Sequence, residues 1–175
     1  LAPNLISDQG NLPSVSELKN PQMMANVSFG QGTLMATPIQ VAGLINTIAS
    51  GGIYASPNLI EGLVNEKLDY VEKHKPPKAK RVITTKTANK LSAYMKTSVE
   101  EGTSKKGKPK NATACAKTGT AETGLMDGDR HIIQAWYAGF FPAEKPKYSI
   151  VVLAEDGAGG GESCGPVFSD IVDKV

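Results

Sequence analysis

The sequence is poor in the residues that build metal sites, membrane spans and strongly charged surfaces. Its 175 residues include two cysteines, two histidines and one tryptophan, and their spacing gives no zinc-binding pattern. No apolar run approaches the roughly eighteen residues of a membrane-spanning helix. The net charge of +2 is too small for a nucleic-acid binder that relies on overall basic charge. We therefore expect no metal, no cofactor, no nucleic-acid partner and no membrane segment in this chain.

The remaining composition is that of an ordinary globular protein. Hydrophobic residues make up 40% of the chain and charged residues 21%, which excludes a disordered protein because enough apolar material is present for a core. The length suits one domain. The chain starts at Leu1 rather than at a methionine and carries no signal-like segment, so we expect it to be part of a larger protein.

Three segments have the pattern of helices. Residues 37–50 open with a capping box, in which Thr37 is followed three residues later by Gln40 and Pro38 occupies the first turn. This segment is apolar around most of its circumference, so we expect it to be deeply buried. A second helix is predicted from residue 84 or 85 to about 101, and a short amphipathic helix is predicted to open at Pro166.

The last third of the chain reads as β-structure. Residues 113–118, 133–141 and 148–156 have strand patterns, with a hairpin connection at 142–146 and a flexible loop at 157–161. We divide the chain into an irregular lead-in (1–30), a part with helices and loops (31–112), and sheet strands with a C-terminal helix (113–175). Such segregated elements indicate an α+β fold with an antiparallel sheet.

Several short patterns are uninformative by themselves. Residues 102–108 spell G-x-x-x-x-G-K, but Pro109 replaces the hydroxyl residue that a phosphate-binding loop requires. A turn is favoured for 127–129, and solvated loops are favoured for the lysine-rich segments 73–81 and 105–110. His131 has no visible catalytic partner. Cys115 and Cys164 either pair or serve as small buried apolar residues.

The informative string is Lys117-Thr118-Gly119-Thr120-Ala121. It is informative because other segments along most of the chain match the same pattern in the same order. In this region the sequence resembles the transpeptidase domain of class B penicillin-binding proteins, whose third motif is K-T-G followed by Thr or Ser. Further matches occur in the order of the family: residues 30–32, 37–40, 51–57, 101–103, 135–140 and 165–168. The resemblance implies the penicillin-binding-protein and serine β-lactamase-like fold, an antiparallel sheet flanked by helices, of which this chain holds a C-terminal portion.

The resemblance also implies roles for the motif. Thr118 and Thr120 are expected to bind the terminal carboxylate of a peptidyl-D-Ala-D-Ala stem, and Lys117 is expected to attract it. Gly119 lets a substrate or β-lactam lie along the strand edge. The backbone N–H of Thr120 is expected to be one of two oxyanion-hole donors, which makes Lys117 and Thr120 the catalytic candidates.

The family also needs a nucleophile motif, S-x-x-K, and a second motif, S-x-N. Residues 16–19 and 56–58 match these patterns, but we interpret both matches as fortuitous. The nucleophile should open a buried helix so that its lysine lies in a dry site. Here Asn20-Pro21 comes directly after Lys19 and is expected to stop a helix almost at once. We therefore expect the nucleophile to lie upstream of Leu1.

Two other positions leave alternatives open. Gln31 either shapes the turn between Gly30 and Gly32 or faces the cleft, and the turn is favoured. Trp136 and Tyr137 are expected to be core residues on alternate sheet faces rather than stacking partners of a substrate.

The most direct interpretation is a portion of a D,D-transpeptidase that cross-links peptidoglycan and reacts with penicillins. The alternatives are a binding or scaffold module of the same fold without a nucleophile, and a hydrolytic relative such as a serine β-lactamase. The implied partners are stem peptides, β-lactams, the missing N-terminal part of the same domain and other cell-wall synthesis proteins. The implied location is the extracytoplasmic face of the bacterial membrane, on an anchor outside this chain.

Overall fold

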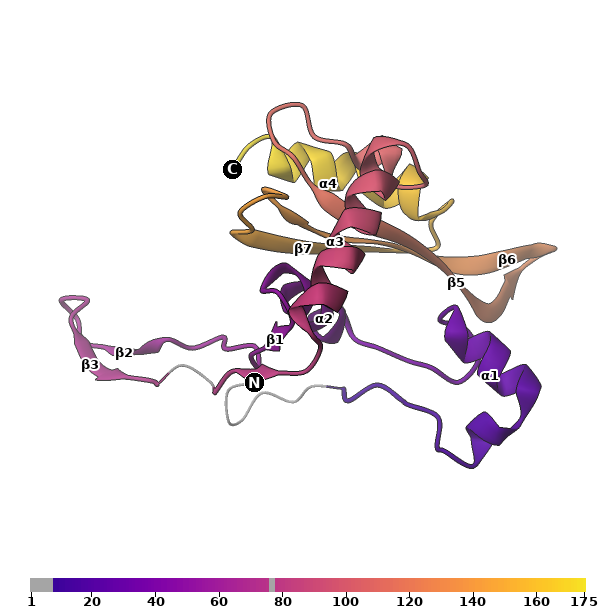
Figure 1. Ribbon diagram of the computed structural model, residues 1–175, viewed down its shortest axis with the longest axis horizontal. Coiled ribbons are helices and arrows are strands. Elements are labelled where there is room, and N and C mark those ends of the chain that lie inside the picture. The colour runs from indigo at the N-terminus through magenta and orange to yellow at the C-terminus, as the bar shows by residue number, and fades with distance from the viewer. Residues whose placement is uncertain (1–7, 76–77) are drawn as a thin grey trace.

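The computed structural model describes residues 8–75 and 78–175, and a three-stranded sheet lies at its centre (Figure 1). Strands β5 (Cys115–Asp127), β6 (Arg130–Phe141) and β7 (Tyr148–Glu155) run antiparallel in the order β5-β6-β7. The fold is therefore the predicted mixture of helices and antiparallel sheet.

Helices cover both faces of this sheet. Helix α2 (Pro38–Ala49) packs on one face and α4 (Gly165–Val172) on the other, while α3 (Thr85–Glu100) crosses the start of β5 and contributes to both cores (Figure 1). The core on the α2 face consists of Ile45, Ile48, Met95, Cys115, Ala138 and Phe140. The core on the α4 face consists of Val99, Ala114, Ala116, Ala135, Tyr137, Phe141, Cys164, Phe168 and Val172.

Helix α2 begins as predicted but is less buried than expected. The Thr37 hydroxyl accepts from the Gln40 amide, and the Gln40 side chain accepts from the Thr37 amide, which completes the capping box. Gly43, Ile45, Thr47 and Ile48 are buried, but Leu44 between them in the sequence is 60% exposed. The prediction of deep burial was therefore wrong for Leu44, which no other described segment covers.

The N-terminal part contains a helix where the sequence predicted irregular structure. A 3₁₀ turn, η1 (Glu17–Lys19), precedes helix α1 (Pro21–Ser28), in which the Asn20 side chain caps the Gln22 amide. Asn20-Pro21 ends η1 as predicted, since Asn20 is extended, and Pro21 also opens α1, where its missing N–H costs nothing. Residues 1–7 of the predicted lead-in lie outside the described residues.

Two small sheets extend from the body of the molecule. Strand β1 (Ile53–Tyr54) pairs with β4 (Lys80–Arg81), and β2 (Gly62–Val64) pairs with β3 (Tyr70–Lys73) in a hairpin at the far end of an extended arm (Figure 1). The lysine-rich segment expected at 73–81 follows this hairpin, and its Pro76 and Pro77 lie outside the described residues. No described helix is both long and apolar enough to cross a membrane.

The cysteines are unpaired and buried, which settles the alternative left open by the sequence. Cys115 belongs to the core on the α2 face and Cys164 to the core on the α4 face, so the sheet separates them. Burial raises the pKa of the Cys115 thiol to about 11. Both residues therefore act as small apolar core residues.

Candidate active site

The predicted site residues lie together on β5, near the start of a long strand rather than at the end of a short one. Lys117 and Thr120 are exposed, and Thr118 and Gly119 are half-buried. The strand is longer than the predicted 113–118 because β6 already begins at Arg130 and pairs with it, with Asp127 opposite Arg130 beside the turn at Gly128.

The two threonines point to the same side of the sheet. Side chains alternate along a strand, and Cys115 packs in the α2-face core whereas Ala116 packs in the α4-face core. Thr118 and Thr120 therefore share the α4 face with Ala116. There they line a pocket of about 610 Å³ whose other lining residues are Gly102, Thr103, Lys105, Lys106, Gly159, Gly160, Gly161 and Glu162.

Thr103 holds one of the two hydroxyls in place. The Thr118 hydroxyl donates to the Thr103 hydroxyl at 2.9 Å, while the Thr120 hydroxyl faces the Gly160 amide at 3.5 Å. Thr103 belongs to the Glu101-Gly102-Thr103 string that supported the resemblance, but the sequence did not assign it a role in the site. Its contact with Thr118 joins segments fifteen residues apart, which local patterns do not reveal.

Lys117 carries a positive charge at the strand edge. Its ammonium group donates to the Thr118 carbonyl at 2.7 Å, and it forms no ion pair with a carboxylate among the described residues. An exposed cation 3.4 Å from the Thr118 hydroxyl is suited to attract an anionic ligand.

The backbone of β5 at Gly119 is closely packed on both faces of the sheet. A Cβ at this position would lie 3.3 Å from the Cβ of Trp136 on β6. On the opposite side, Gly160 approaches so closely that a Cβ on it would lie 2.7 Å from the Gly119 carbonyl oxygen and 2.2 Å from that of Trp136. Gly160 thus lets the loop after β7 rest directly on the backbone of the sheet, while Gly119 leaves room for Trp136 on the other face.

Gln31 reaches the site strand from the other end of the chain. Its side-chain amide donates to the Thr120 carbonyl at 3.2 Å, while Gly30 and Gly32 on either side have positive φ angles of 84° and 81°. The segment therefore forms a turn and also contacts the site, so the two alternatives hold together. The N–H and C=O of one strand residue point to the same edge of the strand. The contact of Gln31 with the Thr120 carbonyl is therefore consistent with a Thr120 N–H that faces the outer edge of β5, the edge that is not paired with β6.

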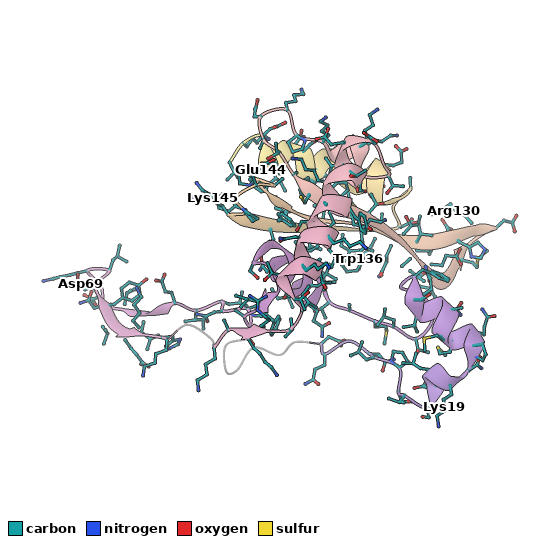
Figure 2. The ribbon with its side chains drawn as sticks, in the orientation of Figure 1. Lys19, Asp69, Arg130, Trp136, Glu144 and Lys145 are labelled. Atoms are coloured by element: carbon teal, nitrogen blue, oxygen red, sulfur yellow. The ribbon has the colours of Figure 1, made fainter. Side chains whose placement is uncertain are left out.

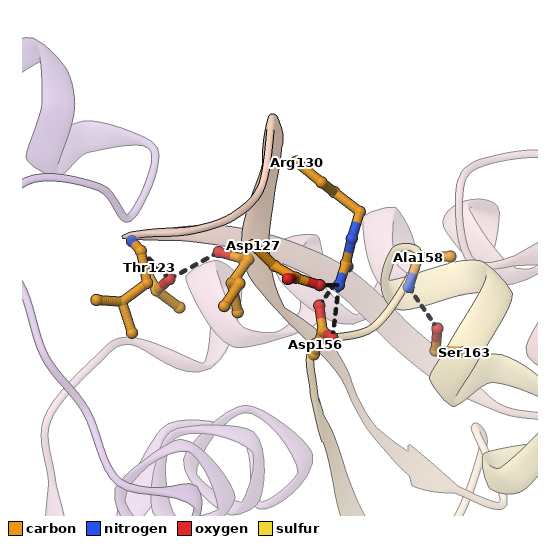
Figure 3. A network of polar contacts seen from close by, with 8 residues as sticks. Thr123, Asp127, Arg130, Asp156, Ala158 and Ser163 are labelled. Atoms are coloured by element: carbon orange, nitrogen blue, oxygen red, sulfur yellow. Dashed lines mark hydrogen bonds and ion pairs between the residues drawn. The ribbon is translucent and has the colours of Figure 1, made fainter.

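The pocket wall formed by residues 157–164 is fixed at its start by a network of ion pairs (Figure 3). Arg130 binds Asp156 with two hydrogen bonds of 2.5 and 2.9 Å and binds Asp127 at 3.0 Å. The hydrogen bonds with Asp156 raise the pKa of Arg130 and lower the pKa of Asp156. Two residues further on, the Ala158 amide donates to the Ser163 hydroxyl at 2.9 Å.

The end of this wall is a short π-helical turn, η3 (Gly160–Cys164), that leads directly into α4. The buried Cys164 thiol contacts the Ala135 carbonyl at 3.1 Å. The predicted flexible loop at 157–161 is therefore partly helical and firmly packed, because its glycines allow close approach to the sheet.

The aromatic pair on β6 lies on alternate faces as predicted, but only Tyr137 is a core residue. Tyr137 is fully buried on the α4 face, where its hydroxyl donates to the Ser104 carbonyl at 2.8 Å, and burial raises its pKa. Trp136 is half-buried on the other face, along a second hollow of about 580 Å³ that Gln31 also lines. His131 is exposed near the end of the β5–β6 hairpin, opposite Met126.

The two serine motifs are not assembled with this site. Ser16 is exposed at the start of η1, and its hydroxyl pairs with that of Ser14 at 2.9 Å. Figure 2 shows Lys19 at the edge of the molecule, apart from Trp136 on the sheet.

Residues 56–58 line a different pocket, next to Tyr148 at the start of β7. Thr120, by contrast, pairs with Ala135, which pairs with Ala154 near the other end of β7. No serine, cysteine or histidine occurs among the described residues that line the Thr118–Thr120 pocket. This arrangement is suited to binding an anion, and neither serine motif supplies it with an attacking group.

Comparisons with known proteins agree with this geometry. The family model for the penicillin binding protein transpeptidase domain matches residues 7–173. The peptidoglycan D,D-transpeptidase PbpA of Mycolicibacterium smegmatis is 35% identical over 145 residues, which cover 80% of this chain and 29% of that protein. PbpA of Mycobacterium tuberculosis is 30% identical over 168 residues, covering 93% of this chain and 34% of that protein.

Solved structures show the same similarity. The ceftriaxone acyl-enzyme complex of penicillin-binding protein A from M. tuberculosis superimposes with a TM-score of 0.79 and 30% identity, over 89% of this chain and 36% of that one. A peptidoglycan synthetase from Bifidobacterium adolescentis gives a TM-score of 0.84 and 27% identity, over 98% of this chain and 32% of that one. The chain therefore spans about a third of the length of the relatives that it matches.

Proposed function

Because the chain belongs to the penicillin-binding protein transpeptidase domain family, we propose that it is the C-terminal part of a class B D,D-transpeptidase. In this proposal the complete protein cross-links peptidoglycan stem peptides through an acyl-serine intermediate. The observation that carries the proposal is the arrangement on β5, where Thr118 and Thr120 line one pocket and Lys117 places a cation at the strand edge.

The proposed ligand is the terminal carboxylate of a D-Ala-D-Ala stem, or the carboxylate of a β-lactam that mimics it. The hydroxyls of Thr118 and Thr120 donate hydrogen bonds to this carboxylate, and Lys117 supplies positive charge. Because no described strand pairs with the outer edge of β5, the peptide can lie along it as an additional strand. The M. tuberculosis relative forms acyl-enzyme complexes with penicillin G and ceftriaxone, which supports this ligand class.

The proposed chemistry needs an oxyanion hole and a nucleophile. We assign one donor of the hole to the backbone N–H of Thr120, a type of donor whose loss typically costs about 3–4 kcal/mol in the barrier. We place the nucleophile outside these 175 residues, since Ser16 is exposed, pairs with Ser14 and is not among the residues that line the Thr118–Thr120 pocket. The N-terminal part of the domain is then the partner that supplies the attacking group.

The same proposal places the parent protein at the extracytoplasmic face of the bacterial membrane, where peptidoglycan is built. Other cell-wall synthesis proteins are further proposed partners. A second candidate function, a binding or scaffold module without a nucleophile, is favoured by one observation: no serine lines the described pocket.

Covalent labelling of the complete protein that contains this chain separates the two candidates. We expect fluorescent penicillin to label the unaltered protein, and Thr118→Val and Thr120→Val to slow labelling about 10- to 100-fold, because each removes a hydrogen bond to a charged group. Thr97→Val is the matched control, since Thr97 is exposed on α3 and its hydroxyl forms no hydrogen bond among the described residues. Absence of label on the unaltered complete protein would favour the scaffold module.

A further inference from the structure

A carboxylate lines the pocket that is proposed to bind a carboxylate. Glu162 lies in η3, in the wall that faces Thr118 and Thr120. Two negative charges in a partly enclosed site repel each other, and the repulsion grows as water is displaced. An uncompensated Glu162 would therefore weaken binding of the substrate that Thr118 and Thr120 are placed to hold.

The opposite wall supplies the compensating charge. Lys106, in the 3₁₀ turn η2 (Lys105–Gly107), forms an ion pair with Glu162 across the pocket. The neighbouring Lys105 also lines the pocket and has no ion-pair partner among the described residues. With two lysines and one glutamate, the charged side chains of the described lining sum to one positive charge.

The ion pair is not needed to hold the two walls together. Gly161 already approaches the other wall so closely that a Cβ on it would lie 2.8 Å from the Thr103 carbonyl oxygen. The buried Cys164 and the Arg130–Asp156 pair fix the two ends of the loop. The side chains of Lys106 and Glu162 are 57% and 58% exposed, and pairs that exposed contribute little to folding stability.

We propose that Lys106 neutralises Glu162 so that the pocket accepts an anionic ligand, and that Lys105 keeps the pocket positive. This inference rests on the proposed function, because it concerns the same carboxylate-binding site. Lys106 is in this view a positioning residue: it acts on the charge of Glu162 and does not itself touch the ligand. Its removal should therefore affect a charged ligand and leave a neutral one unaffected.

The test compares penicillin G with its neutral methyl ester on the complete protein that contains this chain. The second-order rate of acylation is measured at low and at high salt for each probe. For penicillin G we expect Lys106→Met to lower the rate about three- to tenfold at low salt, with a smaller loss at high salt. We expect Glu162→Gln to leave the rate equal or higher, and the double variant to return within about twofold of the unaltered protein. For the methyl ester, the rate of each variant should equal that of the unaltered protein.

Lys108→Met is the matched control, because Lys108 follows η2 directly and pairs with Glu100 away from the pocket lining. The inference is overturned if Lys106→Met slows both probes equally, which would indicate a structural role, or slows neither. It is also overturned if Lys108→Met reproduces the loss. If the unaltered complete protein is not acylated by either probe, the proposed function itself fails and the inference falls with it.

Discussion

The sheet body and the extended arms of this chain differ sharply in burial. Among the residues that the structure describes, the buried ones lie in α2 and just after it, in α3, or in residues 104–172. None of the described residues 8–42 or 53–83 is buried. The β2–β3 hairpin illustrates the contrast, with Leu63, Leu68 and Val71 between 55% and 79% exposed. An isolated two-stranded hairpin is marginally stable in water.

The difference indicates which part of the site is self-supporting. Strand β5 and the wall of residues 157–164 are held by two hydrophobic cores, so they keep their geometry without further segments. Gln31 comes from an arm and reaches Thr120 by one hydrogen bond. We propose that the arms gain their missing contacts from the rest of the parent domain, which is also the proposed source of the nucleophile.

The largest expected effect is loss of a core aromatic in the body. Phe168 is fully buried and its ring centroid lies 4.7 Å from that of Tyr137, so Phe168→Ala should cost about 3–5 kcal/mol of unfolding free energy. Leu63→Ala in the β2–β3 hairpin removes a 55% exposed side chain and should change stability by less than about 0.5 kcal/mol. Denaturant unfolding of the 175-residue chain measures both. Equal losses in the two variants would break the distinction between body and arms.

A smaller effect is expected from an ion pair in the body. Glu144 binds Lys96 at 2.7 Å and Thr113 at 2.5 Å, and these hydrogen bonds lower its pKa from 4.5 to about 2. Because the folded-state pKa is depressed, the stabilisation is present above about pH 4.5 and is lost as the pH falls towards 2. Glu144→Gln should therefore lower the Tm at pH 7, and its difference from the unaltered chain should shrink between pH 4.5 and 2.

Glu66→Gln is the matched control for this titration, because Glu66 lies beside the β2–β3 turn and forms no ion pair among the described residues. Its Tm should follow that of the unaltered chain at every pH. A Glu144→Gln curve that runs parallel to the unaltered one down to pH 2 would contradict the assigned role of Glu144.

Features encoded by neighbouring residues were predicted from the sequence. The Thr37 and Gln40 capping box is an interaction within one helical turn, and it begins α2 where the pattern placed it. The site motif on β5 was found because its residue types lie consecutively, from Lys117 to Thr120. The alternate faces of Trp136 and Tyr137 follow from the two-residue period of a strand.

Features that depend on distant pairing were missed. The extension of β5 to Asp127 depends on the register with Arg130, and strand propensity depends strongly on such tertiary context. The contact of Gln31 with the Thr120 carbonyl spans 89 positions, and the contact between Lys106 and Glu162 spans 56. The exposure of Leu44 was also unpredictable, because an apolar helix face does not reveal whether another segment covers it.

The most direct test of the central claim is the intact mass of this 175-residue chain after incubation with a β-lactam. The chain is proposed to hold the carboxylate-binding strand without the attacking group, so its mass should remain unchanged, while the complete protein should gain the mass of one β-lactam. An adduct on the 175-residue chain that disappears in the Ser16→Ala variant would contradict the claim and would make residues 16–19 a true nucleophile motif.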